Sequence, residues 1–200
     1  MRIFIAIQLP CAFRVSLCNA CDGLRMARPG LRWVDPENMH LTLAFLGELD
    51  QAGIERAVQA ARLAITSART DQAISAFELC TAGLLTFPRR GPASVLAAAV
   101  GTGAPEVTVL AEYLERALQR VGGEAGLPFR PRERRPFLPH ITVARAARSG
   151  VVLSASERST PLVAACLVGT MAVYRSELGS GGAHHEIIKE LAFCGDIDQG

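Results

Sequence analysis

The motif His40-Leu41-Thr42-Leu43 recurs one hundred positions later as His140-Ile141-Thr142-Val143, and this repeat is the most informative feature of the chain. In an extended strand, successive side chains point to opposite faces, so each histidine shares a face with the threonine two residues later. The aliphatic residues of both copies point to the other face, where they pack into a core. Each copy therefore predicts a half-buried strand that presents one imidazole and one hydroxyl to the same side.

The residue types in this repeat favour proton transfer around a bound anion. The chain has 4 histidines, and two of them occupy equivalent places in the repeat. Two imidazoles facing each other across a cleft can give and take protons near neutral pH, because an unperturbed histidine titrates at about 6.5. Thr42 and Thr142 can donate hydrogen bonds to oxygens of an anion between them. A single copy would be read as an ordinary half-buried histidine, but the repetition favours a functional site containing His40 and His140.

The size and net charge of the chain limit the classes of protein to which it can belong. With 200 residues, half of them apolar, the chain can bury a substantial core as one domain or as two tightly joined lobes. The net charge of +2 is too small to indicate bulk attachment to nucleic acid or to a membrane. No apolar stretch approaches the roughly 18 residues that cross a bilayer, and the apolar start of the chain reads as a strand rather than a signal peptide. We expect a soluble, cytoplasmic protein without membrane contact, and a monomer by default.

Neither the cysteines nor the remaining histidines indicate a metal or a cofactor. Cys18 and Cys21 have the spacing of half a zinc knuckle or of a redox pair, but a second pair and a nearby histidine are missing from the sequence. At helical spacing both pack as small hydrophobic residues. His184-His185 follows a glycine-rich turn and lacks carboxylates at metal-ligand spacing. Because the sequence also has no glycine loop of the kind that cradles nucleotide phosphates, we expect neither metal nor cofactor.

Hydrophobic periodicity outlines strands that alternate with helices. Strands are expected at residues 2–8, 32–34, 40–47, 74–79, 94–100, 160–165, 168–175 and 186–193, besides the second motif strand. Helices are expected at 13–24, 50–65 and 107–121, with Asp50 as an N-cap and Gly122-Gly123 as the end of the last one. This mixture predicts an α+β protein. The similar order of elements in the two halves suggests two similar lobes whose sheets meet at a shared cleft.

The motifs and their flanks resemble a known family. Residues 40–47 and 135–145 resemble the two signatures of the 2H phosphoesterase superfamily, and most closely those of the bacterial and archaeal RNA 2′,3′-cyclic phosphodiesterases, also called 2′-5′ RNA ligases. Residues 2–7, 32–34 and 174–178 fit the same family, so the resemblance covers nearly the whole chain.

The resemblance implies both a fold and an activity. The fold is a single α+β domain over residues 1–200, with two pseudo-symmetric lobes, two antiparallel sheets, helices on the outside and one motif from each lobe in a central cleft. The activity is metal-independent opening of 2′,3′-cyclic phosphates at RNA ends to give 2′-phosphates, with 2′-5′ joining as the related reaction. His140 would be the base and His40 the acid, although the near symmetry of the motifs leaves this order open. Thr42 and Thr142 would hold the non-bridging phosphate oxygens.

The resemblance also implies a role for Arg145, five residues after the second histidine. In this family an arginine at that position assists in binding the phosphate. Strict strand alternation would turn Arg145 away from His140, so a bulge or a strand end must redirect it. A solvated arginine at the strand end is the alternative.

Further RNA contacts are open to two interpretations. The loop before the second motif carries Arg130, Arg132, Arg134 and Arg135, which either touch RNA phosphates or form an ordinary solvated loop. Phe4 and Phe45 either stack on a terminal base or pack in the core.

Two other functions remain open. One is a non-catalytic protein that binds RNA ends, and the other is a phosphodiesterase for a small cyclic phosphate, such as an ADP-ribose derivative or a nucleoside 2′,3′-cyclic phosphate.

Overall fold

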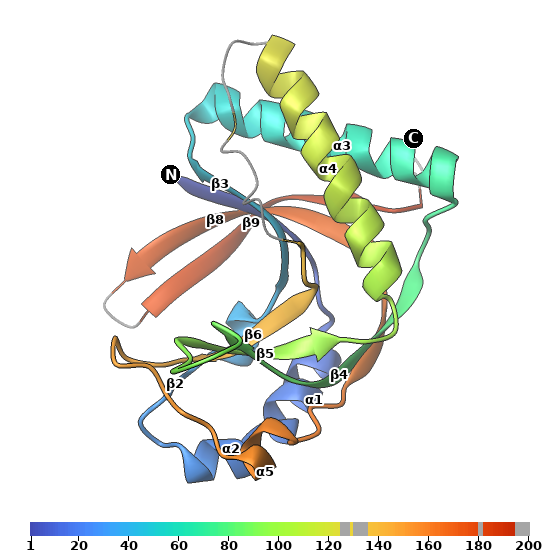
Figure 1. The fold of residues 1–200 in the computed structure, drawn as a ribbon. Helices are drawn as coiled ribbons and strands as arrows, with labels where there is room; N and C mark the ends of the chain where they lie inside the picture. Colours follow the sequence, from blue (N-terminus) through green and yellow to red (C-terminus); the bar gives the residue numbers. More distant parts are fainter. Residues whose placement is uncertain (125–128, 130–135, 180–181, 195–200) are drawn as a thin grey trace.

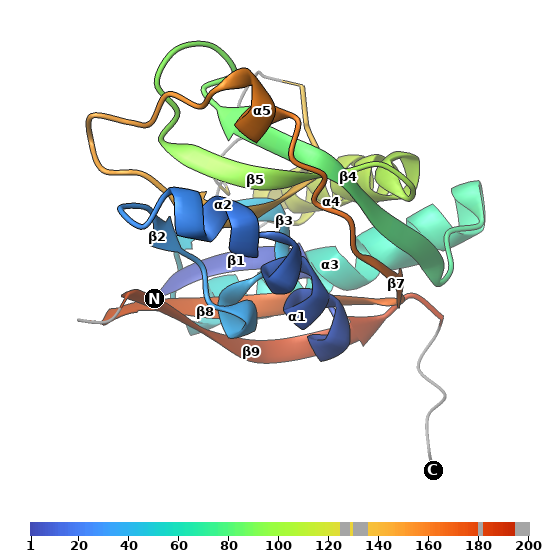
Figure 2. The same ribbon diagram turned by 90° about the horizontal axis from the view of Figure 1, so that it is seen from below.

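Two antiparallel sheets form the centre of the molecule. The computed structural model describes residues 1–124, 129, 136–179 and 182–194. The four-stranded sheet has the order β3 (Leu41–Glu48), β1 (Arg2–Ile7), β8 (Thr170–Gly179), β9 (Gly182–Ala192). The five-stranded sheet has the order β2 (Arg32–Trp33), β6 (His140–Arg145), β5 (Val95–Val100), β4 (Phe77–Phe87), β7 (Ala165–Val168). Figure 2 shows the sheets as separate layers, with β4 and β5 on one side and β8 and β9 on the other. The predicted α+β class with two antiparallel sheets is confirmed.

The helices lie outside the sheets, as predicted. They are α1 (Cys11–Ala20), α2 (Asp22–Ala27), α3 (Gln51–Gln72), α4 (Ala104–Glu124) and α5 (Ala155–Arg158), with a 3₁₀ turn, η1, at Pro36–Asn38. Figure 1 shows α3 and α4 at one end of the molecule, and α1, α2 and α5 at the other. α3 packs against α4 and contacts β8 and β9, while α4 contacts β3. No helix within the described ranges is long and apolar enough to cross a membrane.

The helix boundaries follow capping and packing. Asp50 caps α3 as predicted, because its side chain accepts a hydrogen bond from the Gly53 amide at 2.8 Å. The predicted end of α4 at Gly122-Gly123 is wrong, since the helix continues to Glu124. Gly122 lies one turn after the buried Leu118 and is itself buried, so helix packing outweighs the roughly 1 kcal/mol that glycine costs in a helix.

The predicted strand at residues 160–165 is also wrong. β7 begins only at Ala165 and pairs with β4 alone, at the edge of the sheet. Before it, the buried Ala164 is bound to Thr81 through both of its backbone groups: its amide donates to the Thr81 hydroxyl at 2.8 Å, and its carbonyl accepts from the Thr81 amide at 2.9 Å. A side chain therefore takes the place of one hydrogen bond of a ladder. Apolar residues indicate burial both in a strand and in an irregular segment, so the apolar pattern alone could not place the start of β7.

β1 is buried on both of its faces. Ile3, Ile5 and Ile7 belong to the main core, which both sheets share with the helices. Phe4 and Ala6 point to the other side and form a second, smaller cluster with Ala172 and Tyr174 of β8. This second cluster lies directly under the first motif histidine.

Candidate active site

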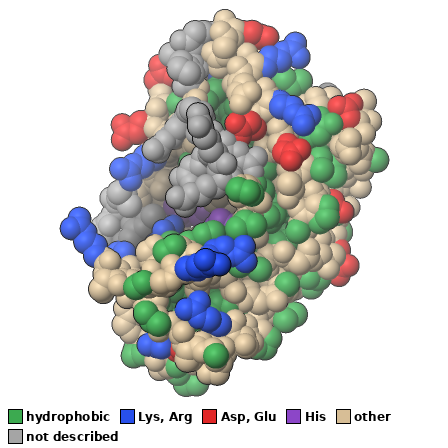
Figure 3. Space-filling model, viewed as in Figure 1, with side chains coloured by type: hydrophobic (Ala, Val, Ile, Leu, Met, Phe, Trp, Pro, Cys, Tyr) green, Lys and Arg blue, Asp and Glu red, His purple; other side chains and the backbone are tan. Residues whose placement is uncertain are grey.

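The two motifs hold equivalent positions, one in each sheet. His40 immediately precedes β3, and His140 is the first residue of β6. The aliphatic residues of both motifs are buried in the main core, while the histidines and threonines are half-buried. Thr42 lies opposite Ala6 of β1, and Thr142 lies opposite an alanine of β5. Figure 3 shows histidine surface at the floor of a hollow between the two sheets.

Each motif histidine is held by a carbonyl two residues earlier in the chain. The Nδ1 atom of His40 lies 2.8 Å from the Asn38 oxygen, and that of His140 lies 2.6 Å from the Leu138 oxygen. A carbonyl oxygen only accepts hydrogen bonds, so Nδ1 carries the hydrogen and donates in both rings. In the neutral imidazole the Nε2 atom then has a free lone pair. Both histidines therefore present the same atom as proton acceptor.

Each motif histidine also packs on a phenylalanine. The His40 ring lies 4.7 Å from Phe4, and the His140 ring lies 4.7 Å from Phe87 of β4, measured between centroids. Phe4 is 2% exposed and also stacks on Tyr174. Its surroundings therefore favour packing in the core over contact with an RNA base. Its ring supports His40 from within the sheet. Phe87 was missed by the sequence analysis, because its approach to His140 depends on strand pairing.

A β-bulge places Arg145 on the same face as the second motif. The register of β6 against β5 shifts between Thr142 and Ala144, which leaves Val143 as the extra residue. The paired residues are His140 with Ala99, Thr142 with Ala97 and Arg145 with Val95. Alternate residues of β5 share one face, and residues opposite each other in a ladder share it too. The bulge that Arg145 required is therefore present.

β3 contains the same irregularity. Thr42 pairs with Ala6 and Phe45 pairs with Phe4, while the register shifts between them and leaves Leu43 as the extra residue. Phe45 is therefore placed after the first histidine as Arg145 is placed after the second. Its ring is 63% exposed, unlike that of Phe4. The first motif thus offers an open aromatic face where the second offers a guanidinium.

Electrostatics connect the two motifs. Burial, followed by the positive charges of His185, Arg145 and His140, lowers the pKa of His40 to about 4, against the raising effect of the Asn38 carbonyl. Arg145 and His140 belong to the five-stranded sheet, whose strand β6 contacts β3, so charged groups from both motifs act on His40. Near neutral pH the unliganded protein therefore holds His40 as a neutral ring.

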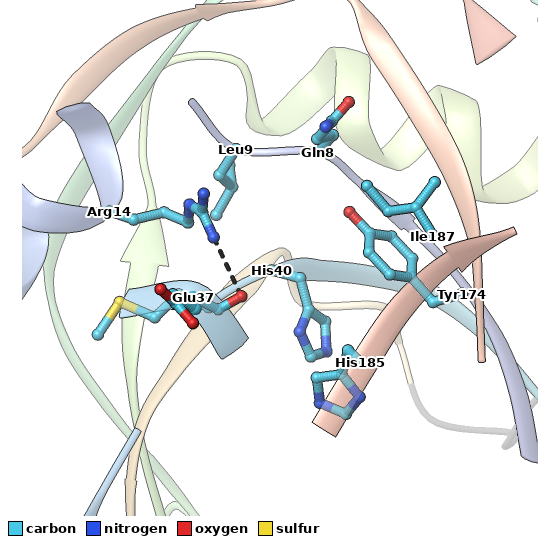
Figure 4. Close-up of a pocket in the computed structure, with 9 residues that line it drawn as sticks. Gln8, Leu9, Arg14, Glu37, His40, Tyr174, His185 and Ile187 are labelled. Carbon is cyan, nitrogen blue, oxygen red and sulfur yellow. Dashed lines mark hydrogen bonds between the residues drawn. The ribbon is translucent and has the colours of Figure 1, made fainter. Parts of the chain in front are cut away.

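A cavity of about 100 Å³ lies beside His40 (Figure 4). It is lined by Gln8, Leu9, Arg14, Glu37, Met39, His40, Tyr174, His185 and Ile187. Arg14 is fixed there by donating to the carbonyl of Glu37 at 3.0 Å. Burial raises the pKa of Tyr174 to about 12, so its hydroxyl stays neutral. His185 was considered in the sequence only for metal binding, and its approach to His40 depends on the pairing of β8 with both β1 and β9.

The structure does not assign every residue singled out in the sequence to this site. Arg130, Arg132, Arg134 and Arg135 fall outside the described residues. Cys18 and Cys21 are free thiols, and Arg25 donates to the Cys18 sulfur at 3.0 Å. In the described part of the chain, no group of three or more histidine, cysteine, aspartate or glutamate side chains could hold a metal ion.

Known proteins share this sequence and fold. Residues 7–96 match the family model described as LigT-like phosphoesterase. An RNA 2′,3′-cyclic phosphodiesterase of Thermus thermophilus is 30% identical over 203 residues, which cover 98% of this chain and 92% of that protein. The crystal structure of TT0787, also from Thermus thermophilus, has a TM-score of 0.77 at 29% identity, covering 98% of this chain and all of that one.

A second solved structure shares the fold at lower identity. The crystal structure of E. coli LigT complexed with 3′-AMP has a TM-score of 0.70 at 24% identity and covers 96% of this chain and 97% of that one. The full-length match to the Thermus relative includes both motifs, in agreement with the resemblance seen in the sequence. The chain therefore belongs to the LigT-like phosphoesterases of the 2H superfamily, alongside relatives named RNA 2′,3′-cyclic phosphodiesterase.

Proposed function

We propose that this protein opens 2′,3′-cyclic phosphates at RNA ends to 2′-phosphates by acid–base catalysis at His40 and His140, without a metal. The observation that carries the proposal is the matched pair of histidines. Each donates Nδ1–H to a backbone carbonyl, so each keeps Nε2 for proton transfer. The names of the relatives support the same substrate class.

In this reaction one imidazole takes a proton from water while the other gives a proton to the leaving oxygen. The new bond joins the water oxygen to phosphorus, and the bond from phosphorus to the ribose O3′ breaks, roughly in line. The O3′ atom leaves as a hydroxyl and the phosphate stays on O2′. A 5′-hydroxyl of a second RNA in place of water would give a 2′-5′ bond, which is the joining reaction.

The two histidines enter this reaction from different environments. The family resemblance assigns His140 as base and His40 as acid. Because the pKa of His40 is lowered to about 4 in the unliganded protein, mainly by burial, an acid at this position must gain its proton as substrate binds. The negative charge of a bound phosphate favours that uptake, since an opposite charge stabilises the protonated ring.

The remaining residues of the motif face would bind the anion and the base. Thr42 and Thr142 donate hydroxyl hydrogens to the non-bridging oxygens, and Arg145 contributes a planar guanidinium suited to phosphate. These donors stabilise the charge that develops as water attacks. The exposed ring of Phe45 offers a stacking face for the terminal base.

Hydrolysis of a 2′,3′-cyclic nucleotide tests the proposal. We expect the wild-type protein to produce only the 2′-phosphate, and His40→Ala or His140→Ala to lower kcat at least 10²-fold, because each removes a proton-transfer group. His184→Ala is the matched control and should keep wild-type activity. Unchanged turnover in either motif variant, or a 3′-phosphate product, would contradict the mechanism.

The choice of substrate is tested with the same assay. We expect an oligoribonucleotide with a cyclic terminus to have a higher kcat/KM than the cyclic mononucleotide or a cyclic phosphate of ADP-ribose. Faster turnover of a small molecule would transfer the same chemistry to that substrate. A wild-type protein that binds the oligonucleotide without turnover would be a non-catalytic RNA-end binder.

A further inference from the structure

A third histidine lies against the first motif. The ring of His185, from β9, is 5.0 Å from the His40 ring and almost perpendicular to it, at 89°. It also meets Phe4 edge-on at 5.0 Å. Figure 4 shows His185 beside His40 at the cavity that both line. The His40 ring is therefore enclosed by Phe4 and His185 together.

This contact breaks the symmetry of the two motifs. Each motif histidine has its own carbonyl partner for Nδ1 and its own phenylalanine at 4.7 Å, and each motif strand contains a bulge. Among the described residues, the ring contact recorded for His140 is with Phe87, and no second imidazole lies against it. The additional ring on the His40 side is thus a difference between otherwise equivalent groups.

The surroundings of His185 favour its neutral form. Its Nδ1 atom is buried and has no hydrogen-bond partner within the described part of the chain. A protonated ring would bury an unpaired N–H at that atom, which is costlier than burying a lone pair. The neutral ring therefore carries its hydrogen on Nε2.

The charges that shift the pKa values of these two rings are positive. Burial lowers the pKa of His185, and His184 and Arg145 lower it further. The positive charges of His185, Arg145 and His140 likewise lower the pKa of His40. Tyr174, Arg14 and Glu37 complete the titratable and charged groups that line the shared cavity. Two imidazoles this close therefore disfavour each other's protonation and titrate as a coupled pair.

We propose that His185 is a positioning residue of the active site, which acts through His40 and makes the two equivalent histidines chemically unequal. Its ring lies edge-to-face against the His40 ring and holds that ring on Phe4. His185 disfavours a positive charge on His40 but makes no ring contact with His140 in the portion of the chain that the structure describes. The rings on the two sides of the phosphate therefore differ in proton affinity. An acid–base pair needs one neutral and one protonated ring, and unequal proton affinities favour one of the two possible assignments over the other. The catalytic part of this proposal rests on the proposed function.

Nuclear magnetic resonance titration of the histidine rings tests the proposal without substrate. His185→Phe keeps a planar ring of similar size but cannot take up a proton. We expect the pKa of His40 to rise toward 6.5 in this variant, and to remain below it because burial is the larger cause. His185→Gln is a second uncharged variant and should give the same direction. His184→Phe is the matched control and should leave the His40 titration close to that of the wild-type protein. An unchanged His40 titration in both His185 variants would overturn the proposal.

The pH dependence of 2′,3′-cyclic AMP hydrolysis tests the consequence for catalysis. We expect His185→Phe to change kcat by about tenfold or less with little change in KM, which is a smaller effect than the loss of a proton-transfer group itself. One limb of the pH profile should move to higher pH, the acid limb if His40 is the base and the alkaline limb if it is the acid. A changed KM with unmoved limbs would make His185 a substrate contact and overturn its positioning role. If the wild-type protein shows no turnover, the proposed function fails while the titration still decides the role of His185.

Discussion

Each motif histidine is oriented by the backbone next to it. The carbonyls of Asn38 and Leu138 select the tautomer of the histidine two positions later, so the geometry is local to each motif. The face to which His40, Thr42 and their counterparts point was predictable, because strand alternation has a period of two. The carbonyl partners were not predictable, because they depend on how the chain turns into each strand.

The position of Arg145 predicts how its replacement should affect catalysis. Because Arg145 shares a face with His140 and Thr142, we expect Arg145→Ala to lower kcat/KM about 10²-fold through loss of donors to the charged transition state. Arg145→Lys should recover only part of this, since an ammonium group lacks the planar fork. The measurement is steady-state hydrolysis of a 2′,3′-cyclic nucleotide. Arg148→Ala, an exposed arginine just past β6, is the control, and an equal loss there would indicate a general charge effect.

Among the elements, the bulges in β3 and β6 limited what the sequence could predict. In β6, both Val143 and the next residue, Ala144, are buried, which is the local trace of the inserted residue. That trace is weak, because a run of two apolar residues is common in any strand. The direction of Arg145 therefore required the register of β6 against β5, and the position of His185 required the pairing of β1, β8 and β9.

Two short helices far apart in sequence are joined by an ion pair. Glu157 of α5 accepts from the guanidinium of Arg28, just after α2, with one of the two contacts at 2.8 Å. It also accepts from the Ser154 amide at 2.7 Å, which completes a capping box that the sequence analysis missed. The Arg28 guanidinium, followed by the Ser154 amide, lowers the pKa of Glu157 to about 2.

The stability of this contact should depend on pH. A carboxylate with a lowered pKa stabilises the folded state above its unfolded pKa of about 4.5, and this contribution disappears as pH falls toward 2. We expect Glu157→Gln to reduce the free energy of unfolding at pH 7 by about 1 kcal/mol, after allowing for solvent screening of a partly exposed pair. Denaturant unfolding at several pH values measures this. Glu124→Gln, in an exposed pair with Arg120, should have almost no effect, and a Glu157→Gln difference that persists at pH 2 would refute the assignment.

On the scale of the whole molecule, the site exists only where the two sheets meet. The four-stranded sheet supplies His40 and Thr42, and the five-stranded sheet supplies His140, Thr142 and Arg145. Because β3 contacts β6 and both sheets share the main core, the two halves of the site are held by the same packing that stabilises the fold. A ligand that bridges the halves should therefore stabilise the entire protein.

Thermal unfolding with 2′-AMP tests this bridging. A ligand at about one hundred times its Kd adds about 2.7 kcal/mol to the stability of the folded protein, which corresponds to an increase in Tm of roughly 5–10 °C at this size. We expect Thr42→Val and Thr142→Val each to lose much of that increase while keeping the ligand-free Tm near the wild-type value. If only one of the two substitutions matters, the anion is bound by one sheet alone.

The burial of β1 on both faces has a consequence for how this family can change. An ordinary half-buried strand can drift in sequence at every second position, because one side is in water. In β1 the isoleucines are constrained by the core and Phe4 by the histidine ring that it supports, so the buried positions 3–7 of this strand are not free to change. New substrate preferences would have to arise in the strands around β1, by substitutions at exposed places such as Phe45, and not in β1 itself.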